Sequence, residues 1–277
     1  MKRKEILKMG ITELNKQKIE EASLKAQMLI EHELGVSHEK FVMNCEDEMS
    51  KESAECFFSG IDMLIKGKPI QYIVNNQNFY GLNFYVDENV LIPQPDTEIL
   101  VEEVIQIAKK IDKKAKVLDI CTGSGAIAIA ICKNQSVKMV ASDVSQKALE
   151  IAKKNALNNS VEMEFIQSNM FENISEKFDI IVSNPPYIET ETIKDLSEEV
   201  KNEPILALDG GKDGLNFYRI LAEQAGNYLK KDGILAVEIG YNQKKKVIEL
   251  LEKFGFCDVY SKKDLGKQDR IVVGKWV

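Results

Sequence analysis

Four adjacent residues, Asn184, Pro185, Pro186 and Tyr187, are the ones best suited to chemistry in this chain. They follow the apolar run 178–183, whose β-branched residues are typical of a buried parallel strand. Ligands of open α/β sheets bind at the carboxyl ends of such strands. Asn184 offers an amide donor and acceptor, the two prolines fix φ at about −65° and lack an N–H, and Tyr187 offers a flat ring. An Asn-Pro pair alone is typical of a simple turn, but the four residues together predict a site that holds a planar NH2 group.

An amide or exocyclic amine nitrogen is a poor nucleophile, because its lone pair is delocalised. We expect Asn184 Oδ1 and the Pro185 carbonyl each to accept one N–H of the target, which orients that lone pair. Tyr187 would stack on the planar group. The two histidines, His32 and His38, lie far from this motif in the sequence. We therefore expect catalysis by positioning and electrostatics rather than by a strong general base, with the product proton passing to a carbonyl or to water.

A second polar segment, 119–125, follows an expected strand at 117–120 and opens an expected helix at 125–133. Its glycines allow a tight turn and a close approach of the backbone to a ligand. Asp143 ends the next expected strand, where a carboxylate can accept from two ribose hydroxyls. The spacing Gly123-x-Gly125-x-x-Ala128, with an acid about 20 residues further on, also satisfies the dinucleotide fingerprint. A nicotinamide cofactor and S-adenosylmethionine (SAM) both fit these residues.

Two features favour SAM. Asp119 can orient the loop or meet a cationic amino group such as that of SAM, and it would repel the pyrophosphate of NAD. The planar-amide site at 184–187 has a role in methyl transfer and none in hydride transfer.

Composition narrows the classes of protein and partner. The chain has 277 residues, of which 44 % are hydrophobic, and a formal net charge of −7. Nonspecific nucleic-acid binding depends on Lys and Arg at phosphates, so we expect no direct nucleic-acid binding. No apolar run approaches the ~18 residues of a membrane span, and the basic start lacks the apolar core of a signal peptide. The five cysteines are scattered, without a CxxC spacing, so we expect reduced thiols in a cytoplasm, no metal site and no membrane.

The order of expected elements indicates a small helical part and a larger α/β part. Residues 1–75 show helical spacing of apolar residues, with Ser50 as a helix cap. Residues 79–92 are expected to form a β-hairpin that turns at 87–89, after which Asp96 or Thr97 would cap a helix. From residue 116, strands and helices alternate and the chain ends in two strands. This pattern predicts a doubly wound, mostly parallel α/β sheet of seven strands with an antiparallel C-terminal hairpin.

Several motifs give the chain a family resemblance over essentially its whole length. The motifs are 67–73, 91–98, 119–125 with Asp143, 167–171, 184–187, 203–211 and 264–270. On these residues the chain closely resembles the HemK/PrmC family, the N5-glutamine methyltransferases of peptide chain release factors. The motif at 184–187 is shared with DNA adenine-N6 methyltransferases, whereas its combination with 92–98 and 203–211 is highly specific.

The resemblance implies a class I SAM-dependent methyltransferase that modifies the glutamine of the Gly-Gly-Gln motif and releases S-adenosylhomocysteine. It implies a helical domain at 1–75 that docks the release factor, a β-hairpin linker at 76–95 and a catalytic domain at 96–277. We expect a monomer. The residues implied for SAM are Asp119, Cys121, Thr122, Gly123, Ser124, Gly125, Asp143, Asn169, Met170 and Asn184, and those implied for the glutamine are Asn184, Pro185, Pro186 and Tyr187.

Three residues depart from the family pattern. Cys121 stands where many relatives have Gly, which narrows the space beside the methionine part of SAM. Asn169 stands where an Asp usually accepts from the adenine amino group, and Asn retains an acceptor in Oδ1. Gln94 stands where the family has Arg, which removes a charge near the site. For 203–211, a structural loop and a direct substrate role stay equally open, and Arg270 is expected to hold the terminal hairpin.

Two other functions fit part of these observations. The first is N6-adenine methylation of DNA, which the net acidity and the lack of a separate basic recognition region disfavour. The second is a SAM-binding module without catalysis, whose helical domain would be a protein-interaction surface. The intact motif at 184–187 disfavours that module.

Overall fold

The computed structural model describes residues 1–111 and 114–277, which divide into two compact units. One unit comprises Met1–Asn76 and Ser197–Asn202, and the other comprises Gln77–Leu196 and Glu203–Val277. The predicted three-part division at residues 75 and 95, with the roles assigned to its parts, stays a prediction.

The first unit is built from helices, all but the last of which bury apolar residues in one core. They are α1 (Arg3–Lys16), α2 (Ala22–Leu34), α3 (His38–Met43), α4 (Lys51–Ile65), α5 (Ile70–Val74) and α9 (Glu198–Lys201). The Ser50 hydroxyl accepts from Ser53 N at 3.0 Å and caps α4, as the sequence predicts. The short helix α9 is held within this unit by an ion pair from the buried Lys25 to Glu199. Asn202 Nδ2 also donates to the Gly67 carbonyl at 3.1 Å.

The second unit begins with a two-stranded hairpin of β1 (Gln77–Phe79) and β2 (Leu82–Phe84). Its turn is Tyr80–Gly81, so the prediction of the hairpin turn at 87–89 was wrong. The chain does turn there, through a bond from Val90 N to the Asp87 carbonyl at 3.2 Å. Tyr80 and Gly81 both have positive φ, 51° and 72°, which matches the tight turns that two-residue hairpins prefer. Asp87 instead accepts from the backbone N–H of Asn89 at 2.9 Å. This local bond mimics a turn without pairing two strands.

Within the described residues, seven strands form one sheet in the order β5-β4-β3-β6-β7-β9-β8. The strands are β3 (Lys116–Ile120), β4 (Lys138–Asp143), β5 (Glu164–Gln167), β6 (Phe178–Ser183), β7 (Leu229–Glu238), β8 (Phe256–Lys263) and β9 (Asp269–Trp276). The first five in this order are parallel, and β9 runs antiparallel to both of its neighbours. The predicted fold class is therefore confirmed.

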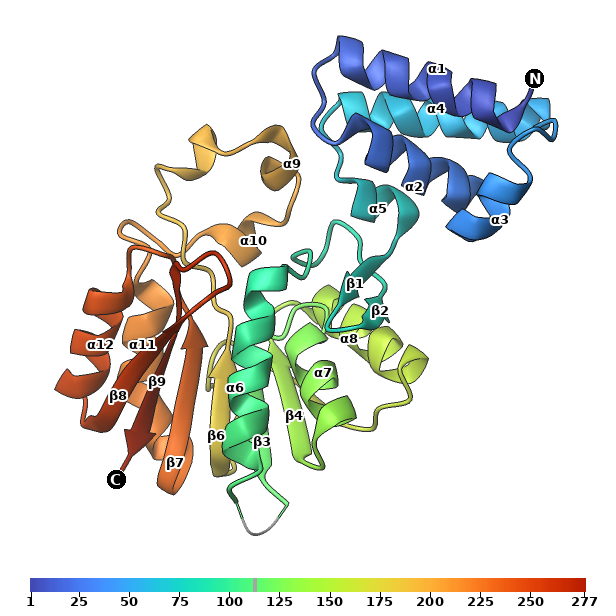
Figure 1. Ribbon diagram of the computed structural model, residues 1–277. Helices are drawn as coiled ribbons and strands as arrows, with labels where there is room; N and C mark the ends of the chain where they lie inside the picture. The colour runs from blue at the N-terminus through green and yellow to red at the C-terminus, as the bar shows by residue number, and fades with distance from the viewer. Residues whose placement is uncertain (112–113) are drawn as a thin grey trace. The chain divides into compact units, whose positions relative to one another are not determined.

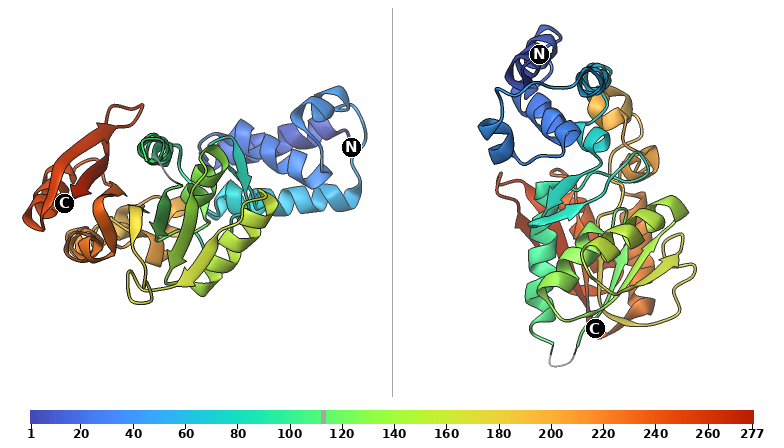
Figure 2. Two further views of the ribbon diagram at one scale, coloured as in Figure 1. Left: turned by 90° about the horizontal axis from the view of Figure 1, so that it is seen from below. Right: turned by 90° about the vertical axis from the view of Figure 1, so that its right-hand side faces the viewer.

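Helices flank the sheet on both faces (Figures 1 and 2). They are α6 (Glu98–Ala108), α7 (Ala126–Asn134), α8 (Gln146–Asn158), α11 (Asn216–Tyr228) and α12 (Lys244–Lys253), with the short helices η1 (Pro95–Thr97), η2 (Ile193–Asp195) and α10 (Ile205–Leu208). The central strands are apolar because both of their faces are covered. Among the described residues, no helix combines the length and apolar character that crossing a membrane requires.

The site is positioned by the order of the central strands. β3 lies between β4 and β6, so the chain runs outward in one direction after β3 and in the other after β6. Ligands of doubly wound sheets bind at such a reversal of strand order, at the carboxyl edge. The loop 121–125, Asp143 and the segment 184–187 follow β3, β4 and β6 and so meet at this edge.

Candidate active site

A cavity of about 300 Å³ opens among the loops that follow the parallel strands. The expected site residues in its lining are Cys121, Thr122, Gly123, Ser124, Asp143, Asn169, Asn184 and Pro186. The expected residues outside its lining are Asp119, Gly125, Met170, Pro185 and Tyr187. The fold thus brings the cofactor loop together with Asn184 and Pro186 at one cavity, and five of the expected residues do not line it.

Asp143 is held in place by backbone N–H groups. Its Oδ2 accepts from Gly123 N and its Oδ1 from Ser145 N, each at 2.9 Å. Burial raises the pKa of this carboxyl, whereas these backbone bonds lower it. A Cβ at Gly123 would have no atom within 4 Å, and φ is +55° there, so the loop leaves open space beside the carboxylate.

Asp119 does not line the cavity as Asp143 does, and it orients the loop through a hydrogen bond. It is fully buried, and its Oδ2 accepts from the Thr122 hydroxyl at 2.6 Å. Among the described residues, its Oδ1 has no hydrogen-bond partner. Burial raises the pKa of Asp119 to about 7. Of the two roles that the sequence left open, the structure displays the loop-orienting contact.

The structure shows the surroundings of all three residues that depart from the family pattern. Cys121 has a φ of 60°, in the left-handed region that glycine occupies without strain, and burial raises the pKa of its thiol. A non-glycine residue in this conformation costs on the order of 1 kcal/mol. Asn169 Nδ2 donates to Glu172 Oε1 at 2.8 Å, which leaves Oδ1 as the acceptor at the cavity. Gln94 lines the cavity and donates to the Ile92 carbonyl at 3.1 Å.

The cavity fits SAM. Asp143 can accept from ribose hydroxyls, Asn169 Oδ1 can accept from an adenine amino group, and Val144 and Ala148 supply apolar wall. The open space at Gly123 leaves room for a ligand to approach the backbone of the loop closely.

The Asn-Pro-Pro-Tyr segment is anchored at both ends. At its start, the Ser183 hydroxyl donates to the Ile120 carbonyl at 2.7 Å, and Asn184 Nδ2 makes a long bond of 3.4 Å to Thr97 Oγ1. At its end, the Tyr187 hydroxyl donates to Glu238 Oε1 at 3.3 Å. Burial raises the pKa of Tyr187, which keeps this hydroxyl protonated as a donor.

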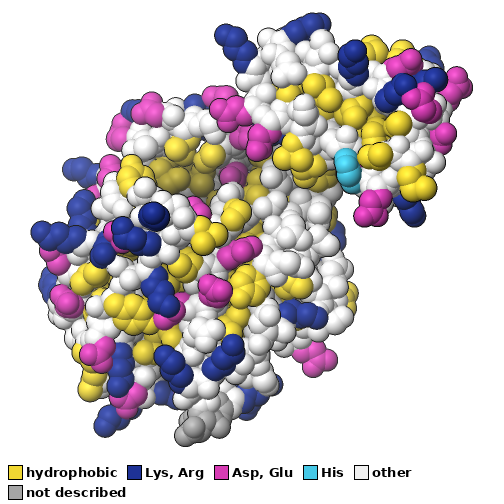
Figure 3. All heavy atoms as spheres, viewed as in Figure 1, with side chains coloured by type: hydrophobic (Ala, Val, Ile, Leu, Met, Phe, Trp, Pro, Cys, Tyr) yellow, Lys and Arg dark blue, Asp and Glu magenta, His cyan; other side chains and the backbone are white. Residues whose placement is uncertain are grey.

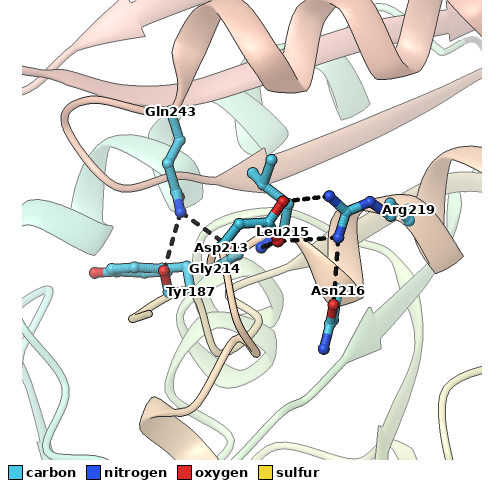
Figure 4. A network of polar contacts seen from close by, with 7 residues as sticks. All are labelled: Tyr187, Asp213, Gly214, Leu215, Asn216, Arg219 and Gln243. Carbon is cyan, nitrogen blue, oxygen red and sulfur yellow. Dashed lines mark hydrogen bonds and ion pairs between the residues drawn. The ribbon is translucent and has the colours of Figure 1, made fainter. Parts of the chain in front are cut away.

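The backbone of Tyr187 is fixed by a separate amide (Figure 4). Gln243 Nε2 donates to the Tyr187 carbonyl at 3.0 Å and to the Gly214 carbonyl at 3.1 Å. The turn that carries Gly214 is tied in turn to α11 by an ion pair between Asp213 and Arg219. Residues 184–187, which we call the tetrad, are thereby held in place by contacts to Gln243, which precedes α12, and to a turn that is bonded to α11.

Two residues that the sequence analysis missed support the tetrad from inside the fold, Glu238 and Gln243. Glu238 follows a run of apolar residues on β7, and a carboxyl at the end of such a strand was a sequence signal for a residue near the site. Asp96 or Thr97 was expected as a helix cap, and Thr97 is the N-cap residue of α6. Its side chain makes no cap bond and is turned to Asn184.

Asn155 was missed as well. It is a fully buried amide on the apolar face of α8, and a polar residue at that spacing was the available signal. Its Nδ2 donates to Ser124 O at 2.9 Å, and its Oδ1 accepts from Tyr85 N at 2.7 Å. It therefore joins the cofactor loop to the segment that follows the hairpin.

The segments 92–98 and 203–211 are joined by a buried carboxyl. Glu203 Oε2 accepts from the backbone N–H of Ile92 at 2.9 Å. Burial raises the pKa of Glu203 to about 7. Arg270 bonds Asp264 at 2.9 Å and Asp96 at 3.0 Å, which holds the turn of the terminal hairpin against η1.

Solved structures share this fold. A methyltransferase from Pyrococcus furiosus has a TM-score of 0.54 and 20% identity, with 71% of this chain and 90% of that chain covered. The 16S rRNA N2 G1207 methyltransferase of Thermus thermophilus, solved with AdoMet and guanosine, has a TM-score of 0.54 and 16% identity, with 73% and 50% covered. Identities this low bear on the fold alone.

Closer relatives are found by sequence. The family model described as PrmC N-terminal domain matches residues 5–74, and that described as Methyltransferase small domain matches residues 94–203. The release factor glutamine methyltransferase of Clostridium acetobutylicum is 40% identical over 90% of this chain and 89% of its own length. That of Streptococcus pneumoniae is 43% identical over 86% of each. The resemblance read from the motifs is confirmed, and the chain belongs to the release factor glutamine methyltransferase family.

Proposed function

We propose that this chain transfers a methyl group from SAM to the side-chain amide nitrogen, N5, of the glutamine in the Gly-Gly-Gln motif of class I peptide chain release factors. The observation that supports this most directly is the position of Asn184. Its side chain lies in the wall of the same cavity as Asp143 and the 121–124 loop. Asn184, which we expect to hold the planar amide, and the residues that we expect to hold the methyl donor thus line one space.

The protein's part in the reaction is to hold the target amide. SAM, when bound, supplies an electrophilic methyl group on a sulfonium sulfur. Asn184 Nδ2 is committed to Thr97, so Asn184 Oδ1 is the half of the amide that accepts an N–H of the glutamine. The Pro185 carbonyl accepts the other N–H, and the Tyr187 ring packs on the amide plane. These contacts hold the nitrogen lone pair out of conjugation and aim it, which is catalysis by positioning.

The proton of the methylated nitrogen leaves without a strong base. The two histidines of the sequence, His32 and His38, belong to the helical unit. We propose that the carbonyls that accept the N–H groups, or water, take this proton after transfer.

We propose further that the helical part, residues 1–75, docks the body of the release factor and that the hairpin segment 76–95 links it to the catalytic part. We also propose that the protein acts as a cytoplasmic monomer without binding nucleic acid directly. On the face in Figure 3, Lys and Arg side chains are interspersed with Asp and Glu side chains, and the net charge is −7. Both features fit a protein substrate better than a polyphosphate backbone.

One assay separates this function from its rivals. Purified protein with methyl-labelled SAM is offered a release factor, its Gly-Gly-Ala variant and duplex DNA. We expect label on the first substrate alone. Label on DNA would support adenine methylation, equal label on both factors would place the target outside the motif, and label on none would support a SAM-binding module.

A further inference from the structure

The segment 208–214, which we call the cradle loop, is paired with the chain that leaves the tetrad. Ile188 N donates to the Leu208 carbonyl at 3.0 Å, and Gly210 N donates to the Ile188 carbonyl at 2.8 Å. These bonds pair the two segments in parallel at Ile188 and Asp209. The residue that follows the tetrad is therefore held by backbone hydrogen bonds that do not belong to the seven-stranded sheet.

Asp209 adds a side-chain link between the same two segments. Its Oδ1 accepts from Gly211 N at 2.8 Å and from the Thr190 hydroxyl at 2.7 Å. Thr190 N in turn donates to the Gly211 carbonyl at 3.0 Å. A carboxylate oxygen can accept two hydrogen bonds, so one atom fixes both the turn of the cradle loop and its position beside Thr190.

The cradle loop also packs against the backbone of the tetrad itself. A Cβ added at Gly210 would lie 2.7 Å from Tyr187 Cα and 2.9 Å from the Pro186 carbonyl oxygen. A Cβ added at Gly214 would overlap the Tyr187 carbonyl oxygen. Glycine permits such a close approach of two backbones because it has no side chain. The peptide between Pro186 and Tyr187 is therefore in direct backbone contact with the cradle loop.

Gln243 bonds the tetrad and the cradle loop at once (Figure 4). Its Nε2 donates to the carbonyls of Tyr187 and Gly214 at 3.0 and 3.1 Å, and its Oε1 accepts from Gly240 N at 2.9 Å. The side chain is buried. A glutamine amide provides the two donors and the acceptor that these three backbone groups require.

The cradle loop reaches the cavity only through the tetrad. Pro204, Leu206 and Ala207 line the cavity, whereas among the described residues neither Gln243 nor any member of the cradle loop lines it. Pro186 does line it, and the next residue carries the ring that we expect to stack on the target amide. A displacement of the cradle loop would therefore act on the reaction by moving the tetrad backbone.

We infer that the cradle loop and Gln243 form a positioning element for glutamine methylation, which fixes the backbone of Pro186 and Tyr187. The inference rests on the proposed function. It assigns residues 208–211 of the segment 203–211 to positioning, where the sequence left a structural and a substrate role open. A displacement of about 1 Å near the reacting group costs about 100-fold in rate. We expect other residues to hold SAM and the body of the release factor, so their affinities should not depend on the cradle loop.

Gly210→Ala in the full-length protein tests the backbone contact. Gly210 lies outside the left-handed region, so the new methyl group adds no backbone strain at its own residue. It must instead displace the backbone of Pro186 and Tyr187. With a release factor as substrate, we expect kcat to fall about 100-fold, and the Kd for SAM and the KM for the release factor to stay within about twofold of wild type.

Gly226→Ala is the matched control. Gly226 is also buried and outside the left-handed region, and a Cβ there would lie 2.5 Å from the Trp276 ring. The added methyl group therefore meets a side chain of β9 and not the tetrad. This variant should lower Tm and keep wild-type kcat. Equal losses of kcat in Gly226→Ala and Gly210→Ala would overturn the inference, because a general loss of stability would explain both.

Gln243→Glu tests the amide while keeping its shape. The carboxylate retains an acceptor for Gly240 N but offers no donor to the carbonyls of Tyr187 and Gly214. We expect the same loss of kcat, about 100-fold, with KM and Kd unchanged. A kcat within about threefold of wild type would overturn the inference, even where Gly210→Ala does not fold. A loss carried by KM would also overturn it, because the cradle loop would then belong to substrate binding.

Asp209 offers a test by rescue. Asp209→Asn keeps Oδ1 as an acceptor for Gly211 N and the Thr190 hydroxyl, whereas Asp209→Leu removes it. We expect Asp209→Asn to keep most of kcat and Asp209→Leu to lose at least about tenfold. Equal kcat values in the two variants would contradict the role of this oxygen in positioning.

Hydrogen exchange separates this inference from the proposed function, because it needs no substrate. The amide hydrogens of Ile188 and Gly210 are bonded between the two segments, so they should exchange slowly in wild type. In Gln243→Glu they should exchange at least about tenfold faster, and in Gly226→Ala they should not change. A wild-type protein that methylates no release factor contradicts the proposed function. Unchanged exchange in Gln243→Glu contradicts the role of the cradle loop.

Discussion

At the scale of single residues, two amide side chains in the cavity lining each have one half bonded to the protein, and we propose that the other half is left for a ligand. Asn184 donates through Nδ2 to Thr97, and Asn169 donates through Nδ2 to Glu172. In both cases the amide oxygen is left as the acceptor at the cavity. An amide whose orientation is fixed in advance loses no entropy of rotation when it binds.

Asn184→Ala tests the amide grip. The variant should lose about 100- to 1000-fold in kcat, the range seen when one preorganised hydrogen-bonding group is removed from a reacting site. SAM affinity, measured by calorimetry, should change little, because Asn184 is one of many residues around the cavity. Retained turnover would rule out the amide-grip mechanism, and the exposed Asn83→Ala serves as the control.

Asp143→Ala tests the cofactor side. The carboxylate is expected to accept from two ribose hydroxyls and is itself held by Gly123 N and Ser145 N. A hydrogen bond to a charged group contributes about 1.5–3 kcal/mol, so the Kd for SAM should rise by roughly 10- to 100-fold. Glu150→Ala, on the exposed face of α8, should leave the Kd unchanged. An unchanged Kd in Asp143→Ala would remove this residue from the cofactor site.

At the scale of elements, buried polar side chains tie together loops that the sheet alone does not hold. Asn155 joins α8 to the cofactor loop, Gln243 joins α12 to the tetrad, and Glu203 joins the segment at Ile92 to α10. Loops at a strand edge have few backbone partners of their own, so such side chains decide their positions. These ties therefore come from residues that do not line the cavity.

The pH dependence of stability tests the Glu203 contact. Burial raises its pKa from 4.5 to about 7, so between these values the folded protein binds one more proton than the unfolded chain. The free energy of unfolding should therefore fall as pH rises through this window, by up to about 3 kcal/mol from this group. In Glu203→Gln, urea unfolding at pH 5 and pH 8 should show a smaller decline than in wild type. An equal decline in both proteins would contradict the contribution of Glu203 to the pH dependence of the free energy of unfolding.

At the scale of the whole molecule, we propose that the chain separates recognition from chemistry. We propose that the helical part provides the docking surface, whereas the catalytic cavity is lined by residues of the other unit. Binding energy from parts of a substrate remote from the reacting atom raises kcat/KM. A folded release factor can engage both surfaces, and a short peptide can engage only one.

A substrate comparison tests this division. A short peptide that contains Gly-Gly-Gln should be methylated with kcat/KM at least about 100-fold below that of the intact release factor, the range that a second linked binding surface provides. Radiolabel transfer under single-turnover conditions measures both substrates with the unmodified enzyme. Equal kcat/KM values would mean that the helical part adds nothing to recognition.

The sequence by itself determined the fold class, the family and which segments meet at the cavity. The fold class and the meeting of the segments follow from local signals, namely the period of apolar residues, glycines between strand and helix, and polar residues at the ends of strands. The family follows from the resemblance of the motifs. Boundaries were less accurate. The hairpin turn lies at Tyr80–Gly81 rather than at 87–89, because positive φ at both residues makes the tighter turn.

Only the tertiary structure decided what stands behind the tetrad. Glu238 is 51 residues from Tyr187 in the sequence, and Thr97 is 87 residues from Asn184. Neither spacing follows a helical or strand period, so no local pattern joins them. They meet because β6 and β7 are paired in the sheet and Thr97 of η1 contacts the residue that follows β6. The pKa of a carboxyl that is buried there is set by its neighbours.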